Sequence, residues 1–475
     1  MRQPGRAARL SVGVIIAALA LAFTSAAGAE RYLVVYKSED VPKGASTPIE
    51  RAGGQLVRSY NSIGVAVVDS SNPAFAAILA DESKVDGVSP LSGLNFGLEQ
   101  DSTDWDGELP NGPATDSDTF SALQWNMGQI HAPEAHAVTG GSPAVVVGLL
   151  DSGVDFTHPD LAQNMDFTDS ASCVSGVPDT TPASYQDDNG HGTHNAGSVA
   201  AASNGVGIVG VAPNVKIASI KVAQPSGLIT PAAVVCGFMW AATHNVDVTN
   251  NSYTVDVGAT TAGDPLDFFC HDDPVQQPLI KAVKRAVRFA LRSGVSVVAS
   301  AGNSNIDLAH PALGNDCVRL PSELPGVIAV SATALSGQKA SYSNYGVGVI
   351  DVAAPGGDAV PAPPAGFVLS TWPAAIQVPR LLQDTNAPGP AYYRFMAGTS
   401  MAAAHASGVA ALIISRYGDL KRGDASMRPG RVEAYMQQTA TEVPCPPDPT
   451  ACQGGEGANG FYGHGIVDAL AAVTR

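Results

Sequence analysis

The chain has 475 residues, 45% of them hydrophobic, and carries 43 acidic and 26 basic side chains, which gives a formal net charge of -17. This length exceeds that of one ordinary hydrophobic core, so we expect more than one folded unit. Proteins that bind nucleic acid need a basic surface to neutralise phosphates, and the acidic balance excludes that class. An acidic surface suits both secreted proteins and calcium binding, and the charge alone does not choose between them.

The first 29 residues have the three parts of a secretory signal peptide. Three arginines within residues 2–9 precede an apolar run over residues 10–23, and residues 27–29 are small, as at a cleavage site. The alternative is an uncleaved membrane anchor, but the apolar run is short for a membrane span. We therefore expect cleavage before Glu30 and a secreted, extracellular protein.

Residues 30–96 predict a small domain of mixed α and β structure. The expected elements are strands at residues 32–36, 54–58 and 65–68 and an amphipathic helix at residues 73–85. Residues 97–120 are rich in Asp, Gly, Pro, Ser and Thr and contain few apolar residues. Such a composition predicts an exposed acidic linker, the kind of segment where proteolytic cuts concentrate.

Residues 121–475 predict a large α/β domain. The expected strands are 144–150, 215–222, 246–251, 295–299, 327–330 and 349–352, with helices at 231–244 and 279–293 among them. Several of these strands, such as 144–150 and 327–330, are continuously apolar rather than alternating, which is typical of strands buried on both faces. We therefore expect a mainly parallel central sheet.

Six cysteines, together with export, favour disulfide bonds. A zinc site is the alternative, and it fits poorly because the sequence has no C-x-x-C pair. The expected pairs are Cys270–Cys317 and Cys445–Cys452, which leaves Cys173–Cys236 either as a third pair or as free thiols.

Two segments offer an acid and a proton shuttle. Asp151 directly follows a predicted buried strand, and open α/β sheets bind ligands at the carboxyl ends of their strands. His191 lies between Gly190 and Gly192, which leave space around an imidazole that can exchange protons near neutral pH. A metal site at His191 and His194 is the alternative, but the zinc-protease motif requires a Glu directly after its first His.

Two further segments offer a nucleophile and an amide donor. Ser400 follows Gly398 at the start of a predicted helix, where unpaired backbone amides favour negative charge. Taken alone, this segment fits equally well a small-residue core helix capped by Thr399 or Ser400. Asn303 follows Gly302 at another strand end, where its amide can donate to an oxyanion; an ordinary turn is the alternative.

Together the four segments resemble the subtilisin-like (subtilase) family of serine peptidases. The resemblance covers about residues 123–471 and includes the order Asp, His, Ser. The matching motifs are Asp151-Ser-Gly-Val-Asp155, His191-Gly-Thr-His194, Gly398-Thr-Ser-Met-Ala402 and Asn303.

This resemblance implies a subtilisin-like three-layer α/β domain with a mainly parallel central sheet. It implies that residues 30–96 are similar to the inhibitor-I9-like propeptides, small α+β domains that assist folding and then plug the cleft. The implied activity is a serine endopeptidase with Asp151, His191 and Ser400 as its triad and Asn303 in the oxyanion hole. The implied partners are protein or peptide substrates and the chain's own propeptide, with the enzyme acting as a monomer without an organic cofactor.

Further positions carry over from the family with some departures. The implied substrate-binding residues are Ser252, Tyr253, Thr254, Ala301 and Gly302. Thr254 stands where the family has Gly and is expected to reshape the pocket for the residue before the cut. Asn195 replaces a small apolar residue, and residues 255–277 and 357–394 look like insertions.

Residues 205–210 spell the dinucleotide-binding pattern of glycines, but that pattern must follow a strand and open a helix. Here it follows a predicted helix and leads into a strand. The resemblance implies instead one side of a calcium site, without a clear counterpart for the family's N-terminal Gln ligand. The implied Ca²⁺ ligands are Asp160, Asn204 and the carbonyl groups of Ala202, Val206 and Ile208.

Two functional hypotheses remain. The first is an active endopeptidase that releases itself by cutting between about residues 95 and 123, since no Lys or Arg occurs between Lys84 and Lys216 for a basic-site protease to recognise. A maturation protease dedicated to one partner is a narrower version of it. The second is a non-catalytic peptide-binding module with a degenerate site.

Overall fold

The computed structural model describes residues 28–93, 95–98, 116–256, 269–310, 317–360, 364–420, 427–446 and 452–475. All of the expected signal peptide except Gly28 and Ala29, and most of the expected linker, lie outside these residues. Within them, none of the helices combines the length and the apolar character needed to cross a membrane.

The small domain is a four-stranded antiparallel sheet in the order β2-β3-β1-β4. Its elements are β1 (Glu30–Tyr36), α1 (Ser46–Arg51), β2 (Gly54–Tyr60), η1 (Asn61–Ile63), β3 (Val65–Ser70), α2 (Phe75–Ala80) and β4 (Val85–Pro90). The three expected strands are confirmed. The expected helix at residues 73–85 ends earlier, at Ala80, because Val85 already begins β4, which pairs with β1.

The large domain contains a seven-stranded sheet in the order β16-β15-β13-β10-β6-β8-β7, and all its neighbouring strands are parallel. Its strands are β6 (Val146–Asp151), β7 (Ala171–Ser172), β8 (Lys216–Lys221), β10 (Val248–Asn251), β13 (Ser296–Ser300), β15 (Val327–Thr333) and β16 (Val352–Pro355). The expected parallel sheet is confirmed. The last strand begins three residues later than expected, since Val349 and Ile350 belong to a turn closed on the Gly346 carbonyl.

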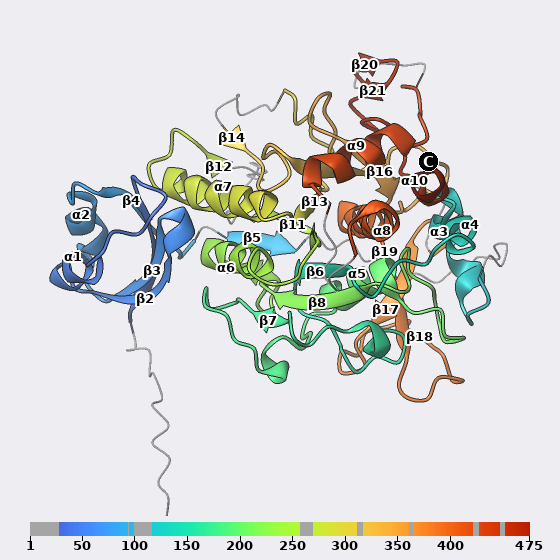
Figure 1. The fold of residues 1–475 in the computed structure, drawn as a ribbon, viewed down its shortest axis with the longest axis horizontal. Helices are drawn as coiled ribbons and strands as arrows, with labels where there is room; N and C mark the ends of the chain where they lie inside the picture. Colours follow the sequence, from blue (N-terminus) through green and yellow to red (C-terminus); the bar gives the residue numbers. More distant parts are fainter. Residues whose placement is uncertain are drawn as a thin grey trace, which may run out of the picture.

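Helices cover both faces of this sheet and complete three layers (Figure 1). On one face lie α5 (His191–Ala200) and α8 (Thr399–Tyr417), which pack against each other. On the other face, α6 (Pro231–Ala241) packs on β8 and β6, and α7 (Gln276–Arg292) packs on β13. Outside these layers lie η2 (Ser121–Leu123), α3 (Trp125–Gln129), α4 (Ala132–His136), η3 (Ala162–Asn164), η4 (Pro182–Ser184), α9 (Pro429–Thr439), β20 (Gly454–Gly455), β21 (Ala458–Asn459) and α10 (Ala469–Thr474).

The two expected insertions form small sheets beside the core. Residues 357–394 contribute β17 (Val368–Trp372), β18 (Leu382–Gln383) and most of β19 (Tyr392–Met396), and β17 packs on α5. The described end of the other insertion forms β12 (Phe269–Cys270), which pairs with β14 (Cys317–Val318). The two expected disulfides, Cys270–Cys317 and Cys445–Cys452, are present, and Cys173 and Cys236, whose state the sequence left open, form a third.

The small domain packs against α7 through β1 and β4 (Figure 1). The buried Arg285 of α7 donates hydrogen bonds to the carbonyl groups of Tyr36 and Ile63 at 2.9 and 3.0 Å. Ser89 of β4 donates to the carbonyl of Val275 at 2.6 Å. These bonds join the two domains through backbone carbonyl groups, so they do not depend on the side chains at the accepting positions.

Candidate active site

The candidate site residues lie at the carboxyl ends of neighbouring strands in the central sheet. Asp151 is the last residue of β6, and Ser252 directly follows β10. The segment Ala301–Asn303 directly follows β13, which pairs with β10. Because parallel strands present their carboxyl ends at one edge, segments far apart in sequence meet there.

Asp151 and His191 form a buried pair. The Nδ1 atom of His191 lies 2.8 Å from Oδ1 and 3.0 Å from Oδ2 of Asp151, and both side chains are fully buried. Ser152 N donates to Oδ1 of Asp151 at 2.7 Å, and Asn195 Nδ2 donates to Oδ2 at 2.9 Å. The carboxylate is therefore held on both oxygens, and the ring nitrogen of His191 that faces it is Nδ1 rather than Nε2.

A second carboxylate fixes the backbone from which His191 projects. Buried Asp187 accepts hydrogen bonds from Gly190 N at 2.9 Å and from Thr193 N at 3.0 Å, so it satisfies amides at the start of α5. Its Oδ1 also accepts from Ser152 Oγ at 2.8 Å, which connects the helix start to the end of β6. Burial raises the pKa of Asp187, and these hydrogen bonds oppose that rise. The sequence analysis missed Asp187 and Asn195 as supporting residues.

Ser400 is the second residue of α8, and α8 packs against the helix that His191 begins. Its Oγ donates to the carbonyl of Ser252 at 3.4 Å, and Ser252 Oγ donates to the carbonyl of Ser400 at 3.0 Å. Two hydrogen bonds thus connect Ser400 to Ser252, which follows β10 and begins the segment expected to bind substrate. At the first turn of a helix, it lies among amides that have no partner within the helix.

Asn303 lies beside the turn that carries Ser400. Its Oδ1 accepts hydrogen bonds from Thr399 N at 2.9 Å and from Thr399 Oγ1 at 2.8 Å. Gly302 N donates to the same Thr399 Oγ1 at 3.0 Å. Because the Oδ1 atom is held, the amide nitrogen faces the turn: a Cβ placed on Gly398 would lie 3.3 Å from Asn303 Nδ2. The arrangement suits donation to an oxygen held at Ser400.

Part of the segment expected to bind substrate forms a strand, and this strand pairs with residues from the end of the expected small domain and the start of the expected linker. β11 (Tyr253–Asp256) pairs antiparallel with β5 (Asn95–Leu98), with Leu98 opposite Tyr253 and Gly97 opposite Thr254. On its other side β5 pairs with β9 (Leu228–Ile229). β5, drawn in light blue, lies away from the other blue strands and forms the middle strand of a three-stranded sheet (Figure 1).

The expected effect of Thr254 on the adjoining pocket remains a prediction, but the register shows how its side chain is accommodated. Thr254 is buried and faces Gly97, which has no side chain. Next to this pair, buried Phe96 packs with its ring 5.7 Å from that of Tyr253 and 5.4 Å from that of Phe269. The expected linker thus begins, at Gly97 and Leu98, as part of the strand that pairs with both β9 and β11.

His194, the alternative metal ligand beside His191, contacts a backbone carbonyl group of the inserted sheet. Its Nε2 lies 3.0 Å from the carbonyl of Arg394, in β19 of the inserted sheet. Burial lowers the pKa of His194 to about 3, and the neighbouring charge of His191 adds to this effect. No group of three or more His, Cys, Asp or Glu side chains within the described ranges is arranged to hold a metal ion.

The loop of residues 202–208, which resembles half of a calcium site, follows helix α5 and leads towards β8, as expected. Oδ2 of Asp160 accepts hydrogen bonds from Ile208 N and from the Tyr393 hydroxyl, both at 3.1 Å. Asp118, from the end of the expected linker, accepts from Asn204 N at 2.9 Å through its own Oδ2. The Oδ1 atoms of both aspartates are buried and have no hydrogen-bond partner in the described part of the chain.

The carboxylates of Asp160 and Asp118 are the side chains that would coordinate a cation at this loop. Burial raises the pKa of Asp160 well above its usual range, and the charges of Asp118 and Asp384 raise it further. A hard cation would give both Oδ1 atoms a partner and offset this repulsion. Carboxylate oxygens of this kind suit Ca²⁺, and we propose that Asp160 and Asp118 would hold it together with backbone carbonyl groups.

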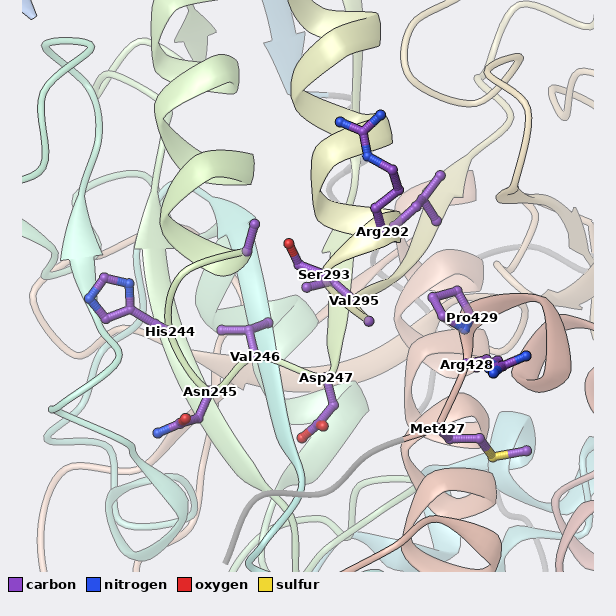
Figure 2. A pocket seen from close by; sticks show the side chains of 13 residues that line it. His244, Asn245, Val246, Asp247, Arg292, Ser293, Val295, Met427, Arg428 and Pro429 are labelled. Carbon is purple, nitrogen blue, oxygen red and sulfur yellow. The ribbon is translucent and has the colours of Figure 1, made fainter. Parts of the chain in front are cut away.

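Figure 2 shows a hollow that is separate from this site. It lies between the ends of α6 and α7 and the residues before α9, and is lined by Val246, Asp247, Ser293, Val295 and Pro429 among others. Asp247 precedes β10 and Val295 precedes β13, so the hollow lies at the amino ends of the strands. The candidate catalytic residues lie at the opposite, carboxyl ends.

Comparison with known proteins agrees with this geometry. A family model described as the subtilase family matches residues 142–465. The chain is 31% identical over 354 residues to subtilisin Savinase of Lederbergia lenta, which covers 74% of this chain and 99% of that protein. It is also 31% identical to an alkaline protease of Alkalihalobacillus alcalophilus, over 74% of this chain and 70% of that protein.

Solved structures share the fold. The epidermin leader peptide processing serine protease (EpiP) of Staphylococcus aureus superposes with a TM-score of 0.70 at 22% identity, covering 94% of this chain and 98% of that one. Fervidolysin of Fervidobacterium pennivorans, a keratinolytic enzyme related to subtilisin, gives a TM-score of 0.66 at 24% identity and covers 94% of this chain and 61% of that one. At these identities the likeness concerns the architecture alone.

Proposed function

Since this chain belongs to the subtilase family and is a serine-type endopeptidase that acts on peptides or proteins, we propose that Asp151, His191 and Ser400 are its catalytic triad. The observation that carries the assignment is the Asp151–His191 pair, with Nδ1 2.8 Å from the carboxylate, on a helix that packs against the helix whose second residue is Ser400. We further propose that the chain is secreted as a precursor and that it processes itself.

In the proposed reaction, Nε2 of His191 takes the proton of the Ser400 hydroxyl as Oγ attacks a peptide carbonyl. Asp151 holds the ring through Nδ1–H and stabilises the imidazolium that forms. The carbonyl oxygen becomes negative and accepts hydrogen bonds from Asn303 Nδ2 and from the backbone N–H of Ser400. His191 then gives the proton to the leaving amine, and water hydrolyses the acyl-enzyme by the same steps.

Hydrolysis of casein by the processed protein tests this proposal, with Ser400→Ala as the inactive counterpart. We expect measurable hydrolysis by the wild type, covalent labelling by a fluorophosphonate probe, and loss of both in the variant. Equal hydrolysis by wild type and Ser400→Ala would refute the assignment. A folded wild type that neither hydrolyses casein nor reacts with the probe would favour the alternative of a non-catalytic peptide-binding module.

We propose that residues 30–98 act as the propeptide and inhibitor. Their C-terminal strand β5 is the middle strand between β9 and β11, with Leu98 N donating to the carbonyl of Gly227 at 3.2 Å. Leu98 lies opposite Tyr253, and the residue before Tyr253 is Ser252, which is bonded to Ser400. A peptide bound in this way blocks the groove for other substrates, so its release must precede activity.

Intact mass and N-terminal sequence of the secreted wild type beside Ser400→Ala test self-processing. We expect the wild type alone to lose the segment from Glu30 to the region after Leu98. Addition of a trace of processed wild type to Ser400→Ala is the control, because it shows that the variant's bond remains cleavable. Processing of Ser400→Ala expressed alone at the same bond would assign the cut to another protease.

A further inference from the structure

The loop that carries Asn303 has an unusual backbone on both sides of this residue. Gly302 has φ of 105° and Asn305 has φ of 52°, both in the left-handed region that most side chains disfavour. Such backbone conformations persist only where neighbouring groups hold them in place. A donor to an oxyanion must itself be held close to its working position. The groups that hold this loop are therefore candidates for residues that position Asn303.

Buried Asn344 is bonded to the backbone on both sides of Asn303. Its side-chain Nδ2 and its backbone N–H donate to the carbonyl groups of the two residues before Asn303, at 2.9 and 2.8 Å. Its Oδ1 accepts from the backbone N–H groups of Ser304 at 3.0 Å and of Ile306 at 2.9 Å. Both ends of the Asn344 side-chain amide are thus used to hold the loop, and the oxyanion candidate lies between the points of attachment.

Asn344 also lies directly against Gly302. A Cβ built on that glycine would fall 2.4 Å from Asn344 Nδ2, so the close approach depends on the missing side chain. Gly302 N donates to Thr399 Oγ1 at 3.0 Å, and the same hydroxyl donates to Oδ1 of Asn303 at 2.8 Å. A shift of the loop would therefore change how Asn303 sits beside the Thr399–Ser400 turn.

The segment that carries Asn344 supports that turn as well. The Tyr342 hydroxyl donates to the carbonyl of Gly356 at 3.0 Å. Gly398 N, two residues before Ser400, donates to the same carbonyl at 2.9 Å. One short segment is thus connected both to the loop of the oxyanion donor and to the turn of the proposed nucleophile, which fixes the two relative to each other.

We propose that Asn344 is a positioning residue that holds the Asn303 amide in place for the oxyanion. The inference rests on the proposed function, and Asn344 acts through Asn303 rather than on the substrate. Without its side chain, the carbonyl of Ala301 and the N–H groups that follow Asn303 lose these partners, and the loop relaxes towards ordinary backbone angles. The Asn303 amide then moves away from the oxygen that becomes negative, so the transition state is stabilised less.

The first experiment compares processed Asn344→Ser with processed wild type on a peptide p-nitroanilide that the wild type hydrolyses. Active sites are counted with a fluorophosphonate, and a precursor that does not process itself is cut by immobilised wild type, which is then removed. We expect kcat to fall by about tenfold to a hundredfold, as for a small displacement of a catalytic group, with KM within about threefold. An unchanged kcat, or a loss in KM alone, would overturn the proposal. Asn344→Thr takes its place if Asn344→Ser does not fold.

Asn459 provides a matched control in β21, because its side chain makes the same kinds of hydrogen bond. Its Nδ2 donates to the carbonyl of Val443 at 2.8 Å, and its Oδ1 accepts from the N–H groups of Phe461 and Tyr462, both at 3.1 Å. We expect Asn459→Ser to keep kcat within about twofold of the wild type, as for a site independent of the chemistry. Equal losses of kcat in Asn459→Ser and Asn344→Ser would indicate general loosening of the fold and would overturn the proposal.

A double-mutant cycle decides whether Asn344 acts through Asn303, since residues that act as a unit give non-additive losses. We expect Asn344→Ser to lower kcat by less than about twofold when Asn303 is already replaced by Ala. The same loss in both backgrounds would overturn this inference while leaving the enzyme a peptidase. A wild type that neither hydrolyses peptides nor reacts with the fluorophosphonate would instead refute the proposed function, and this inference with it.

Discussion

Asn195 donates its side-chain amide to Oδ2 of Asp151 at 2.9 Å, on the same carboxylate that Nδ1 of His191 contacts. Asn195 lies one helical turn after His191 on α5, so both side chains project from one face of the helix towards Asp151. The residue stands where the family has a small apolar side chain. In this chain the helix therefore supplies a further donor that orients the carboxylate.

Asn195→Ala is expected to lower kcat by about tenfold, because a hydrogen bond to a buried charged group contributes about 1.5–3 kcal/mol and Ser152 N still holds the other oxygen. KM should change little, since the Asn195 side chain is completely buried. Steady-state kinetics on one peptide substrate measure both constants. Asn164→Ala is a control of the same chemistry: its amide is also buried but donates to the carbonyl groups of Ala200 and Pro213. Equal kcat values for Asn195→Ala and wild type would contradict the orienting role.

Asn303→Ala is expected to lower kcat by about two to three orders of magnitude with KM within about threefold of the wild type, as for other single oxyanion donors. The substitution also removes the acceptor for Thr399, so the turn itself needs a control. Thr399→Ser keeps the hydroxyl that bonds to Asn303 and should retain most of the activity. A loss for Asn303→Ala that appears only in KM would place Asn303 in ground-state binding rather than at the oxyanion.

The sequence predicted the central sheet well, and it placed the candidate residues at the strand and helix ends where the structure has them, because both depend on local signals. Continuously apolar strands such as β6 and β13 can be recognised without knowing their neighbours, and the motif residues follow them directly. Strand β4 was missed because Asp86, Gly87 and Pro90 are poor strand formers. Its pairing with β1 and its packing on α7 override that propensity.

The supporting residues of the site could not be predicted because they act through contacts that are distant in sequence. Asp187 and Asp118 looked like ordinary loop and linker acids, and only the fold brings them to the start of α5 and to the loop after it. Arg319 lies in a stretch without a motif. Its contact with Gly302 depends on the tertiary fold, which local sequence does not reveal.

His405→Gln is expected to make stability less dependent on pH. His405 is buried between the carbonyl of Met401 and Asn126 Nδ2, both 2.7 Å from its ring nitrogens, and burial lowers its pKa to about 4. An unfolded histidine has a pKa of about 6.5, so the unfolded chain binds the proton first as pH falls. The stability due to neutral His405 is complete above pH of about 6.5 and is lost towards pH 4, by roughly 3 kcal/mol in total.

Melting temperatures of the Ser400→Ala precursor, with and without His405→Gln, measure this effect between pH of about 7.5 and 4.5, the range that spans the unfolded pKa. The Ser400→Ala background prevents self-digestion. Acidification should lower the melting temperature more in the parent than in the variant, because carboxylates that titrate over the same range are common to both. Identical pH dependence in the two proteins would show that His405 does not remain neutral when folded.

We expect the Ser400→Ala precursor to melt at a higher temperature in calcium than in a chelator. The expected site is the loop of residues 202–208, whose backbone donates hydrogen bonds to Asp160 and Asp118. An ion present at about a hundred times its Kd stabilises the folded state by about 3 kcal/mol, which corresponds to several degrees. Asp160→Asn should abolish the difference, whereas Asp272→Asn, an exposed aspartate away from the loop, should keep it. Equal melting temperatures in calcium and chelator would contradict the site. The Asp160 side chain would then be neutral through protonation, since burial already raises its pKa, and it would keep its hydrogen bond with the Tyr393 hydroxyl.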